Sequence, residues 1–251
     1  MRKYSEADVV LVLTGCVIPN CNCGLKVTDI NIRKKHYYDS IRWYLENTPY
    51  KIVFCENSGT DMSGDFHEYC DRIEFVTYIS SKEEGENRSK GYKEMEILQY
   101  AWNNSDFIKN GGVFVKITGR LILKNIESVI NHLVNKKTTS FFSSYQNARL
   151  PMADCRFFFF TKDVWPILLS YKEKIFHCYN FEHVMYDIYN ECKNSGIKFI
   201  YPPYLFDVTG VSGGYGYSYE VTKGKYFIYS IKHFVRWFFF GIGLLPNIKK
   251  K

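Results

Sequence analysis

No stretch of this 251-residue chain is long and apolar enough to cross a bilayer, since a spanning helix needs about 20 consecutive apolar residues. The first apolar run covers only residues 9–13 and is typical of a strand rather than of a signal peptide. We therefore expect a cytoplasmic protein. In that reducing compartment, its eight cysteines should be mostly free thiols.

The cysteines also lack the paired spacing that is usual for structural zinc ligands. Cys16, Cys21 and Cys23 form a C-x4-C-x-C pattern in the loop after the first apolar run. We expect small residues of a ligand-binding loop there, and no metal.

A nucleic-acid-binding stripe is missing as well, because no block of Lys and Arg is interleaved with aromatic residues. The net charge of +7 nevertheless predicts an acidic partner. A phosphorylated ligand or an anionic membrane surface remains, and we expect no nucleic acid partner. A hydrophobic content of 46% and a charged content of 24% are those of an ordinary globular protein with one large lobe or two small ones.

Apolar strands and amphipathic helices alternate along the first half of the chain. Strands are predicted at residues 8–14, 51–55, 73–78 and 113–115, and helices at 66–70 and 92–103. A further helix is expected to run to about Glu46 after an N-cap at Asp29 or Asn31. The second half is predicted to form helices at 125–134, 162–171 and 181–195, and strands at 139–145, 156–161 and 197–201. The alternation predicts a doubly wound α/β fold.

The strand at 113–115 leads directly into Lys116, Thr118, Gly119 and Arg120. Ligands of open α/β sheets bind at the carboxyl ends of the strands. Two cations, a hydroxyl and a flexible backbone at such an end suit a phosphate or a diphosphate. The alternative is a solvated basic turn without a ligand.

Other donor-binding candidates lie at the ends of the first two strands or in the polar loop before the helix at 92–103. They are Thr14, Gly15, Glu56, Asn57, Ser58, Asn87, Arg88 and Lys90. For Arg88 a plain surface position is the alternative.

Two segments resemble the nucleotide-sugar-dependent glycosyltransferases of the GT-A fold, especially bacterial enzymes that build surface polysaccharides such as capsule, O-antigen or lipopolysaccharide. Residues 107–115 look like the family strand that ends in a metal-binding Asp-x-Asp motif, and Asn180-Phe-Glu-His183 looks like the family's acidic helix start. The resemblance covers about residues 8–203 by element order. It implies a GT-A-like, Rossmann-type mixed sheet flanked by helices, a nucleotide-sugar donor, and a carbohydrate or lipid-linked acceptor.

This chain departs from the family in its charged residues. Lys116 and Arg120 stand where the Asp-x-Asp acids would be, so the resemblance implies a metal-independent enzyme in which fixed cations stabilise the leaving diphosphate. Glu182, at the predicted helix start, is then the catalytic base of an inverting transfer. His183 stands where a second acid is usual and serves as base or orients Glu182, while Asp154 is a further catalytic candidate.

The alternatives to these catalytic roles are a helix-capping carboxylate at Glu182, a surface histidine at His183 and a turn residue at Asp154. A nucleotidyltransferase is a second function, but it would need a Gly-rich first loop with a cation, which residues 15–20 match poorly. A basic, non-enzymatic membrane-surface protein is the third.

The C-terminal segment is aromatic, apolar and basic. Residues 234–245 are too few to span a bilayer and too apolar for a solvated tail, and Lys249 to Lys251 follow them. We expect one GT-A-like domain with a nucleotide-sugar-binding half (1–125) and an acceptor-binding half (126–222), followed by a membrane-associating segment (223–251). The protein would then be peripheral on the anionic inner face of the cytoplasmic membrane. A terminal helix docked on the protein's own core is the alternative.

Overall fold

The apolar run after Asp8 forms strand β1 (Val9–Gly15), in which all seven residues are buried. It pairs in parallel with β2 (Lys51–Glu56) and β4 (Val113–Thr118). Because such a strand is covered on both faces, it is apolar at consecutive positions. The computed structural model describes residues 4–19, 25–80, 89–136, 138–147, 150–176 and 178–241.

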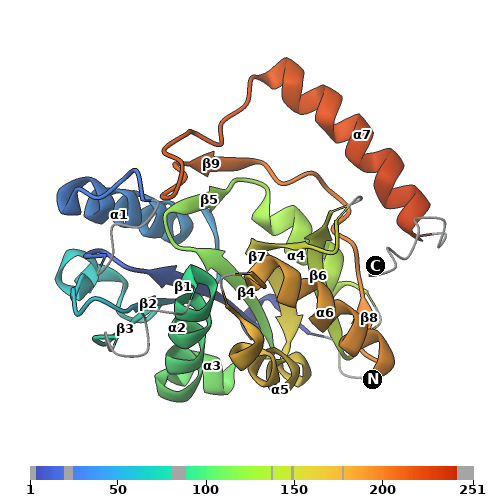
Figure 1. Cartoon of the computed structure of the whole chain (residues 1–251). Coiled ribbons are helices and arrows are strands. Elements are labelled where there is room, and N and C mark those ends of the chain that lie inside the picture. Colours follow the sequence, from blue (N-terminus) through green and yellow to red (C-terminus); the bar gives the residue numbers. More distant parts are fainter. Residues whose placement is uncertain are drawn as a thin grey trace.

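Strand β1 belongs to a seven-stranded sheet of order β3-β2-β1-β4-β7-β6-β8 (Figure 1). The remaining strands are β3 (Ile73–Thr77), β6 (Phe141–Gln146), β7 (Ala153–Thr161) and β8 (Lys198–Phe199). The strands β3, β2, β1 and β4 are parallel, whereas β7 runs antiparallel to β4 and β6. The expected class, an α/β fold with a mixed sheet flanked by helices, is confirmed.

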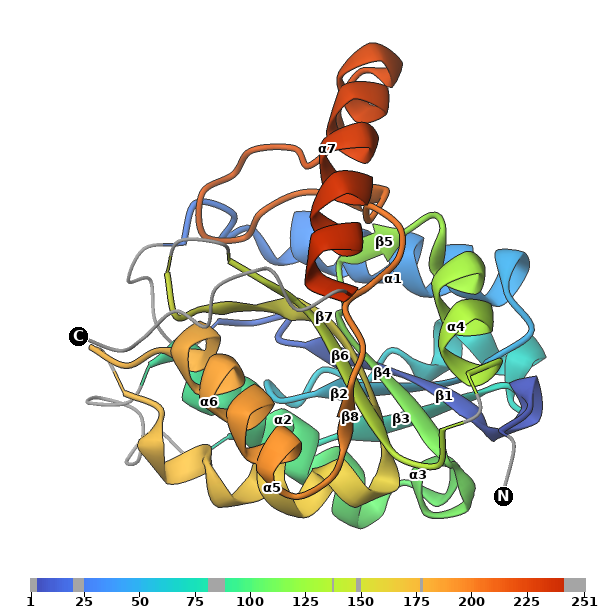
Figure 2. The ribbon, with the colours of Figure 1, turned by 90° about the vertical axis from the view of Figure 1, so that its right-hand side faces the viewer.

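Helices cover both faces of the sheet, and each face has its own apolar core. On one face lie α1 (Ile30–Asn47) and α4 (Ile126–Val134). On the other lie α2 (Lys90–Asn104), α3 (Asp106–Asn110), α5 (Trp165–Ser170) and α6 (Phe181–Asn194). Figure 2 shows α2, α5 and α6 grouped on one side of the strands and α1 and α4 on the other.

The run of four phenylalanines in β7 has a direct structural reason. Successive side chains of a strand point to opposite faces of the sheet. Phe157 and Phe159 join the core under α1 and α4, while Phe158 and Phe160 join the core under α2 and α6. Both faces of β7 are covered, so an apolar residue is favoured at every position.

Several element boundaries differ from the sequence-based expectation. Strand β7 begins at Ala153, earlier than the expected 156, because Ala153 pairs with Gln146 of β6. The expected helix at 162–171 begins with a separate short turn and becomes α5 only at Trp165, next to Pro166, a residue that favours the first turn of a helix. The expected strand at 197–201 is reduced to β8.

Four short 3-10 segments also occur in the described chain. They are η1 (Glu6–Asp8), η2 (Ser63–Tyr69), η3 (Lys162–Val164) and η4 (Lys172–Lys174). The expected short helix at 66–70 corresponds to η2.

The last described part of the chain crosses back over the sheet. Strand β9 (Val208–Gly210) pairs antiparallel with β5 (Leu121–Leu123), and α7 (Lys223–Gly241) follows. Both views place α7 outside the layers of the main sheet and its helices (Figures 1 and 2). Within the described residues, no helix is long and apolar enough to cross a membrane. The expected division at residue 125 stays a prediction, and residues 242–251 lie outside the described part.

Candidate functional site

The carboxyl ends of the parallel strands meet at one edge of the sheet. The register places Thr14 of β1 beside Thr118 of β4, and Gly15 beside Glu56 of β2. The antiparallel β7 brings its first residues to the same edge, since Ile117 pairs with Phe157. The strand-end candidates therefore do gather at one edge, although their ligand-binding roles remain predictions.

Lys116 is completely buried at this edge, and its ammonium group is fully engaged. Its Nζ lies 2.6 Å from the Cys155 carbonyl oxygen and 3.1 Å from Thr118 Oγ1, and it forms an ion pair with Glu94. An ammonium group has three N–H donors, so all of them are used. In this conformation Lys116 presents no free charge to a diphosphate, unlike the expectation from its place at a strand end.

Glu94 is one of the residues that could not be singled out from the sequence. It extends from α2, and its Oε1 accepts hydrogen bonds from Lys116, from Thr14 Oγ1 at 3.1 Å and from Thr118 Oγ1 at 3.3 Å. Its side chain is 22% exposed. A buried lysine in a strand needs a nearby acid, and that requirement was the only signal for Glu94 in the sequence. The amphipathic pattern of α2 does not distinguish it from the neighbouring acid Glu96.

Glu182 reaches the same edge from the start of α6. Asn180 caps this helix by accepting the backbone N–H of His183, so Glu182 lies in the first turn, where the helix dipole favours an ionised carboxylate. The buried thiol of Cys155 lies 3.3 Å from Glu182 Oε1. Burial and then the carboxylates of Glu94 and Glu182 raise the pKa of the Cys155 thiol. The thiol therefore stays protonated and donates to Glu182.

His183 is turned toward the helix cap. Its Nδ1 lies 2.6 Å from Asn180 Oδ1, and its ring stacks on Tyr179 at a centroid distance of 5.3 Å. This arrangement supports the first turn of α6 and so holds the neighbouring Glu182. These contacts do not bear on a role of His183 as the base, which stays a prediction.

Asp154 lies at the edge but is bound by a cation from its own strand. Arg156 holds it with three ionic hydrogen bonds, from Nε to Oδ1 at 3.0 Å, from Nε to Oδ2 at 3.2 Å and from a terminal nitrogen to Oδ2 at 2.7 Å. Only 9% of the Asp154 side chain is exposed, against 38% for Arg156. The guanidinium group also lies over the ring of Tyr219 at 4.9 Å. This pairing leaves Arg156 as a half-exposed cation that the sequence analysis did not single out.

Glu56 has a different environment, because backbone groups of two loops surround it. It is fully buried and accepts the N–H groups of Val17 at 2.8 Å and of Ser58 and Thr60 at 2.9 Å each. The hydroxyl of Ser58 also donates to Glu56 and accepts the N–H of Ile18 at 3.0 Å. Glu56 and Ser58 therefore hold the loops after β1 and β2, and their oxygens are occupied in this conformation.

Asn57, which lies between Glu56 and Ser58, has spare hydrogen-bonding capacity in its side chain. Its backbone joins the end of β1 to the segment after β3, through bonds to Gly15 and Ser80. Its side chain is 6% exposed, and its Oδ1 has no hydrogen-bond partner within the described part of the chain.

Arg33 fixes the loop after β1 from the opposite side. This buried residue of α1 donates to the carbonyl oxygens of Cys16, Val17 and Val27. No pattern in the sequence distinguishes Arg33 from the other polar positions of the helix. Together, Arg33 and Glu56 fix the first residues of this loop by hydrogen bonds to its backbone.

Arg120 points away from Lys116. Its Nε donates to the Val211 carbonyl oxygen at 3.1 Å, and a side chain at Gly213 would meet the guanidinium carbon at 2.7 Å. Burial and the charge of Arg120 lower the pKa of His36 on α1. Arg120 therefore faces α1 and the loop after β9, and the two cations do not form a common clamp here.

The two glycines at the strand ends allow close packing of the backbone. A Cβ atom at Gly119 would lie 2.7 Å from the Thr14 carbonyl oxygen, and one at Gly15 would lie 2.5 Å from the ring of Phe54. Gly119 N also donates to the Thr14 carbonyl oxygen at 2.9 Å. Both positions thus have a packing reason, whatever their role toward a ligand.

The last donor-binding candidates lie at the start of α2. Lys90 is its first residue, after the N-cap Ser89. Asn87 and Arg88 lie outside the described residues. Across the described ranges, no group of three or more His, Cys, Asp or Glu residues is arranged to hold a metal ion. Independence from a divalent metal stays a prediction.

Comparison with known proteins gives only distant structural likenesses. No protein-family model matches the chain, and no curated protein does. One similar solved structure is a glycosyltransferase involved in glycosylation of the major capsid of PBCV-1, with 13% identity, a TM-score of 0.44, and coverage of 76% of this chain and 80% of that chain.

Two further structures are at the same level of similarity. A putative nucleotide-diphospho-sugar transferase from Desulfovibrio desulfuricans has 9% identity and a TM-score of 0.48, covering 78% of this chain and 79% of that chain. A cytidylyltransferase from Leptospira borgpetersenii has 13% identity and a TM-score of 0.44, covering 98% and 99%. At these identities and TM-scores, the likenesses assign neither a family nor an activity to this chain.

Proposed function

We propose that this protein is a glycosyltransferase that moves a sugar from a nucleotide-sugar donor to a carbohydrate or lipid-linked acceptor. The proposal joins the sequence resemblance to GT-A-fold enzymes of bacterial surface polysaccharide synthesis with the geometry of the sheet edge. Its reaction is a single displacement with inversion at the anomeric carbon, without a divalent metal, and it takes place on the cytoplasmic side of the membrane.

The observation that carries the proposal is that Glu182 is less engaged in hydrogen bonds and ion pairs than Glu56, Glu94 and Asp154 at the same edge. Glu56 accepts donors from two loops, Glu94 is paired with Lys116, and Asp154 is held by Arg156. Glu182 is half-buried, and its only hydrogen-bond partner within the described part of the chain is the thiol of Cys155. Thiols are weak donors, so Glu182 is the carboxylate best able to take a proton from an acceptor hydroxyl.

In the proposed reaction, Glu182 removes the proton of the acceptor hydroxyl. The acceptor oxygen forms a bond to the anomeric carbon while the bond from that carbon to the donor diphosphate breaks, and the electron pair leaves with the diphosphate. Arg120 and Arg156, two half-exposed cations at this edge, stabilise the departing charge as fixed donors.

Lys116 takes a positioning role in this scheme. Its bonds to Glu94 and to the Cys155 carbonyl oxygen join α2 to the start of β7. The Cys155 thiol in turn contacts Glu182. The buried pair of Lys116 and Glu94 therefore fixes the start of β7, whose Cys155 contacts the proposed base Glu182.

A panel of nucleotide-sugars, incubated with the full chain with and without sugar or lipid-linked acceptors, tests the function. We expect release of a nucleoside diphosphate that increases when the correct acceptor is present, with inversion read by NMR of the product. In parallel, nucleoside triphosphates are incubated with sugar-1-phosphates. Release of pyrophosphate in that arm, with no turnover of any nucleotide-sugar, would identify a nucleotidyltransferase and overturn the proposal.

A further inference from the structure

Helix α7 carries three distinct stripes along its length. The docking stripe consists of Tyr226, Ser230, His233 and Trp237, the cationic stripe of Lys225, Lys232 and Arg236, and the apolar stripe of Phe227, Ile228, Ile231, Phe234, Val235, Phe238 and Phe239. Within each stripe, residues recur at helical spacing, which places them on a common side of the helix.

The docking stripe attaches α7 to the rest of the protein. The Tyr226 hydroxyl donates to the Leu205 carbonyl oxygen at 3.1 Å, and His233 Nε2 donates to the Pro202 carbonyl oxygen at 2.9 Å. The His233 ring also stacks on Tyr201 at a centroid distance of 5.6 Å. The docked-helix expectation therefore holds for this one side of α7.

The apolar stripe, in contrast, is left uncovered. Its seven side chains are between 42% and 66% exposed, with Phe227 at 66% and Phe234 at 58%. Large contiguous apolar patches are rare on monomeric soluble proteins and mark interaction surfaces. Burial in the protein's own core does not account for this side of the helix.

The charges of α7 are all of one sign. It contains Lys223, Lys225, Lys232 and Arg236, and no aspartate or glutamate. Two copies of the chain packed through this helix would bring these cations together at the edges of the apolar stripe. An anionic surface would instead be attracted to them, so charge complementarity favours a membrane with acidic headgroups over a second copy.

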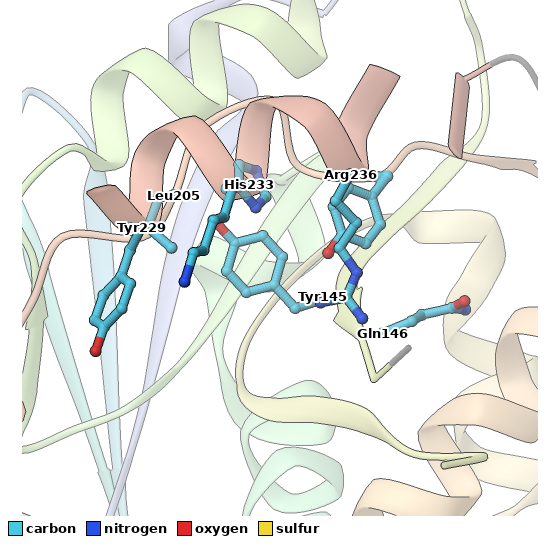
Figure 3. Close-up of a pocket in the computed structure, with 8 residues that line it drawn as sticks. Tyr145, Gln146, Leu205, Tyr229, His233 and Arg236 are labelled. Atoms are coloured by element: carbon cyan, nitrogen blue, oxygen red, sulfur yellow. The ribbon is translucent and has the colours of Figure 1, made fainter. Parts of the chain in front are cut away.

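A cavity of about 220 Å³ lies beneath the cationic stripe (Figure 3). Lys232, His233 and Arg236 line it from α7, and Tyr145 and Gln146 line it from the end of β6. Gln146 Nε2 is buried and has no hydrogen-bond partner within the described residues. Two cations and an unsatisfied amide donor around one cavity match the oxygens of a phosphate.

We propose that α7 binds an anionic membrane surface, with the apolar stripe inserted among the acyl chains and a lipid phosphate held in the cavity beside the cationic stripe. The mix of exposed aromatic residues and cations is that of helices lying in the headgroup region. Gln146 pairs with Ala153, at the start of the strand that carries Cys155, so the cavity lies at the same sheet edge as the candidate site. The membrane proposal itself does not depend on the glycosyltransferase activity.

Cosedimentation of the full chain with vesicles tests this proposal. Vesicles of phosphatidylcholine with a third of phosphatidylglycerol are compared with vesicles of phosphatidylcholine alone. We expect binding to the acidic vesicles that weakens at high salt, and at least roughly tenfold weaker binding to the neutral ones. Inorganic phosphate at millimolar concentration should not release the protein, since it lacks the acyl chains that the apolar stripe contacts.

Point variants separate the two stripes without removing the docked helix. Lys232→Gln with Arg236→Gln should weaken binding to acidic vesicles by roughly 25-fold, at about 1 kcal/mol per cation near an acidic membrane and 1.4 kcal/mol per tenfold change. Phe227→Ser with Phe234→Ser should weaken it by at least about tenfold. The matched controls, Lys193→Gln with Lys198→Gln and Ile32→Ser with Ile79→Ser, change exposed residues away from α7 and should bind as the wild type does.

Each variant must keep the melting temperature of the wild type, which shows that the docking stripe still holds. Failure of the full chain to bind acidic vesicles would overturn the proposal. Equal losses in the α7 variants and the matched controls would also overturn it. A dimer in sedimentation equilibrium that Phe227→Ser with Phe234→Ser converts to a monomer, without any vesicle binding, would assign the apolar stripe to a second copy.

Discussion

Two groups of polar residues at the same sheet edge differ in the hydrogen-bond partners of their acids. In the β2 group, Glu56 is fully buried and accepts backbone donors from Val17, Ser58 and Thr60. The α6 group consists of Glu94, Lys116, Cys155 and Glu182. Its ion pair between Lys116 and Glu94 fixes the start of β7 through the Cys155 carbonyl oxygen, and the Cys155 thiol contacts the less constrained carboxylate of Glu182.

The difference lies in which atoms supply the hydrogen bonds. Backbone N–H groups of two loops occupy the oxygens of Glu56, so removing this acid leaves several buried donors without partners. Glu182 has only a thiol partner within the described part of the chain, so its loss leaves little unsatisfied. One acid therefore maintains structure, and the other is available for chemistry.

The largest effect is expected for Glu182→Gln. The amide keeps the shape of the side chain but cannot accept a proton, so turnover should fall by roughly 10²–10⁴-fold, as for loss of a general base. Donor affinity and melting temperature should stay near the wild-type values. The matched control is Glu191→Gln near the other end of α6, and kcat measurements compare the two. Retention of more than about a tenth of the wild-type rate would move the base to His183 or Asp154.

Breaking the buried pair of the α6 group should cost nearly as much, but in stability. Lys116→Met leaves Glu94 without its ion-pair partner, and loss of one partner from a buried pair typically costs about 3–5 kcal/mol. Urea unfolding measures the change. Adding Glu94→Gln to Lys116→Met should restore part of the loss, because no uncompensated charge then remains. A single-variant cost below about 1 kcal/mol would contradict the burial of the pair.

Arg120→Ala tests whether the cation on the β9 side acts on the leaving group. Removal of a preorganised donor to developing charge costs on the order of 2–4 kcal/mol in transition-state stabilisation, which should appear in kcat/KM. The exposed Lys124, which directly follows β5, provides the matched Lys124→Ala control. If kcat/KM falls less than about threefold, Arg120 only supports the loop at Val211.

Glu56→Gln should act on folding stability and spare chemistry. The amide has one acceptor oxygen where the carboxylate has two, and its NH2 group faces backbone donors, so at least one buried N–H loses its partner. We expect a loss of about 1–3 kcal/mol in unfolding free energy, with kcat of the folded fraction within a few-fold of wild type. A drop in kcat as large as that of Glu182→Gln, at unchanged stability, would remove the contrast between the two groups.

The smallest expected effect is that of metal removal. In the proposed reaction Arg120 and Arg156 stabilise the departing diphosphate, so activity should be unchanged after treatment with EDTA and dialysis. The control is activity of the same preparation with added manganese or magnesium. Full loss with EDTA that either metal restores would show that the departing diphosphate needs a metal after all.

The sequence predicted the strands that build the edge more reliably than the partners of each side chain. Fully apolar runs such as residues 9–13 have few arrangements other than a buried strand, although β4 extends to Thr118, beyond the expected end at residue 115. The gathering of Thr14, Gly15, Glu56 and Thr118 therefore followed from local pattern and from the parallel alternation.

The partners of these residues depended on contacts between distant segments. Glu94 meets Lys116 across 22 positions of sequence, and Arg120 meets Val211 across 91. No local periodicity encodes such pairs. A lysine at a strand end was consistent both with a ligand contact and with a buried ion pair, and only the approach of α2 decided between them.

Helix α7 shows the same limit on a larger scale. Its composition predicted either membrane association or docking on the core, since both need apolar side chains. The amino-acid sequence determined that the segment is helical, basic and apolar around much of its circumference. Tertiary packing decided which stripe contacts Pro202 and Leu205 and which remains exposed, because those contacts join α7 to a segment more than 20 positions away in the sequence.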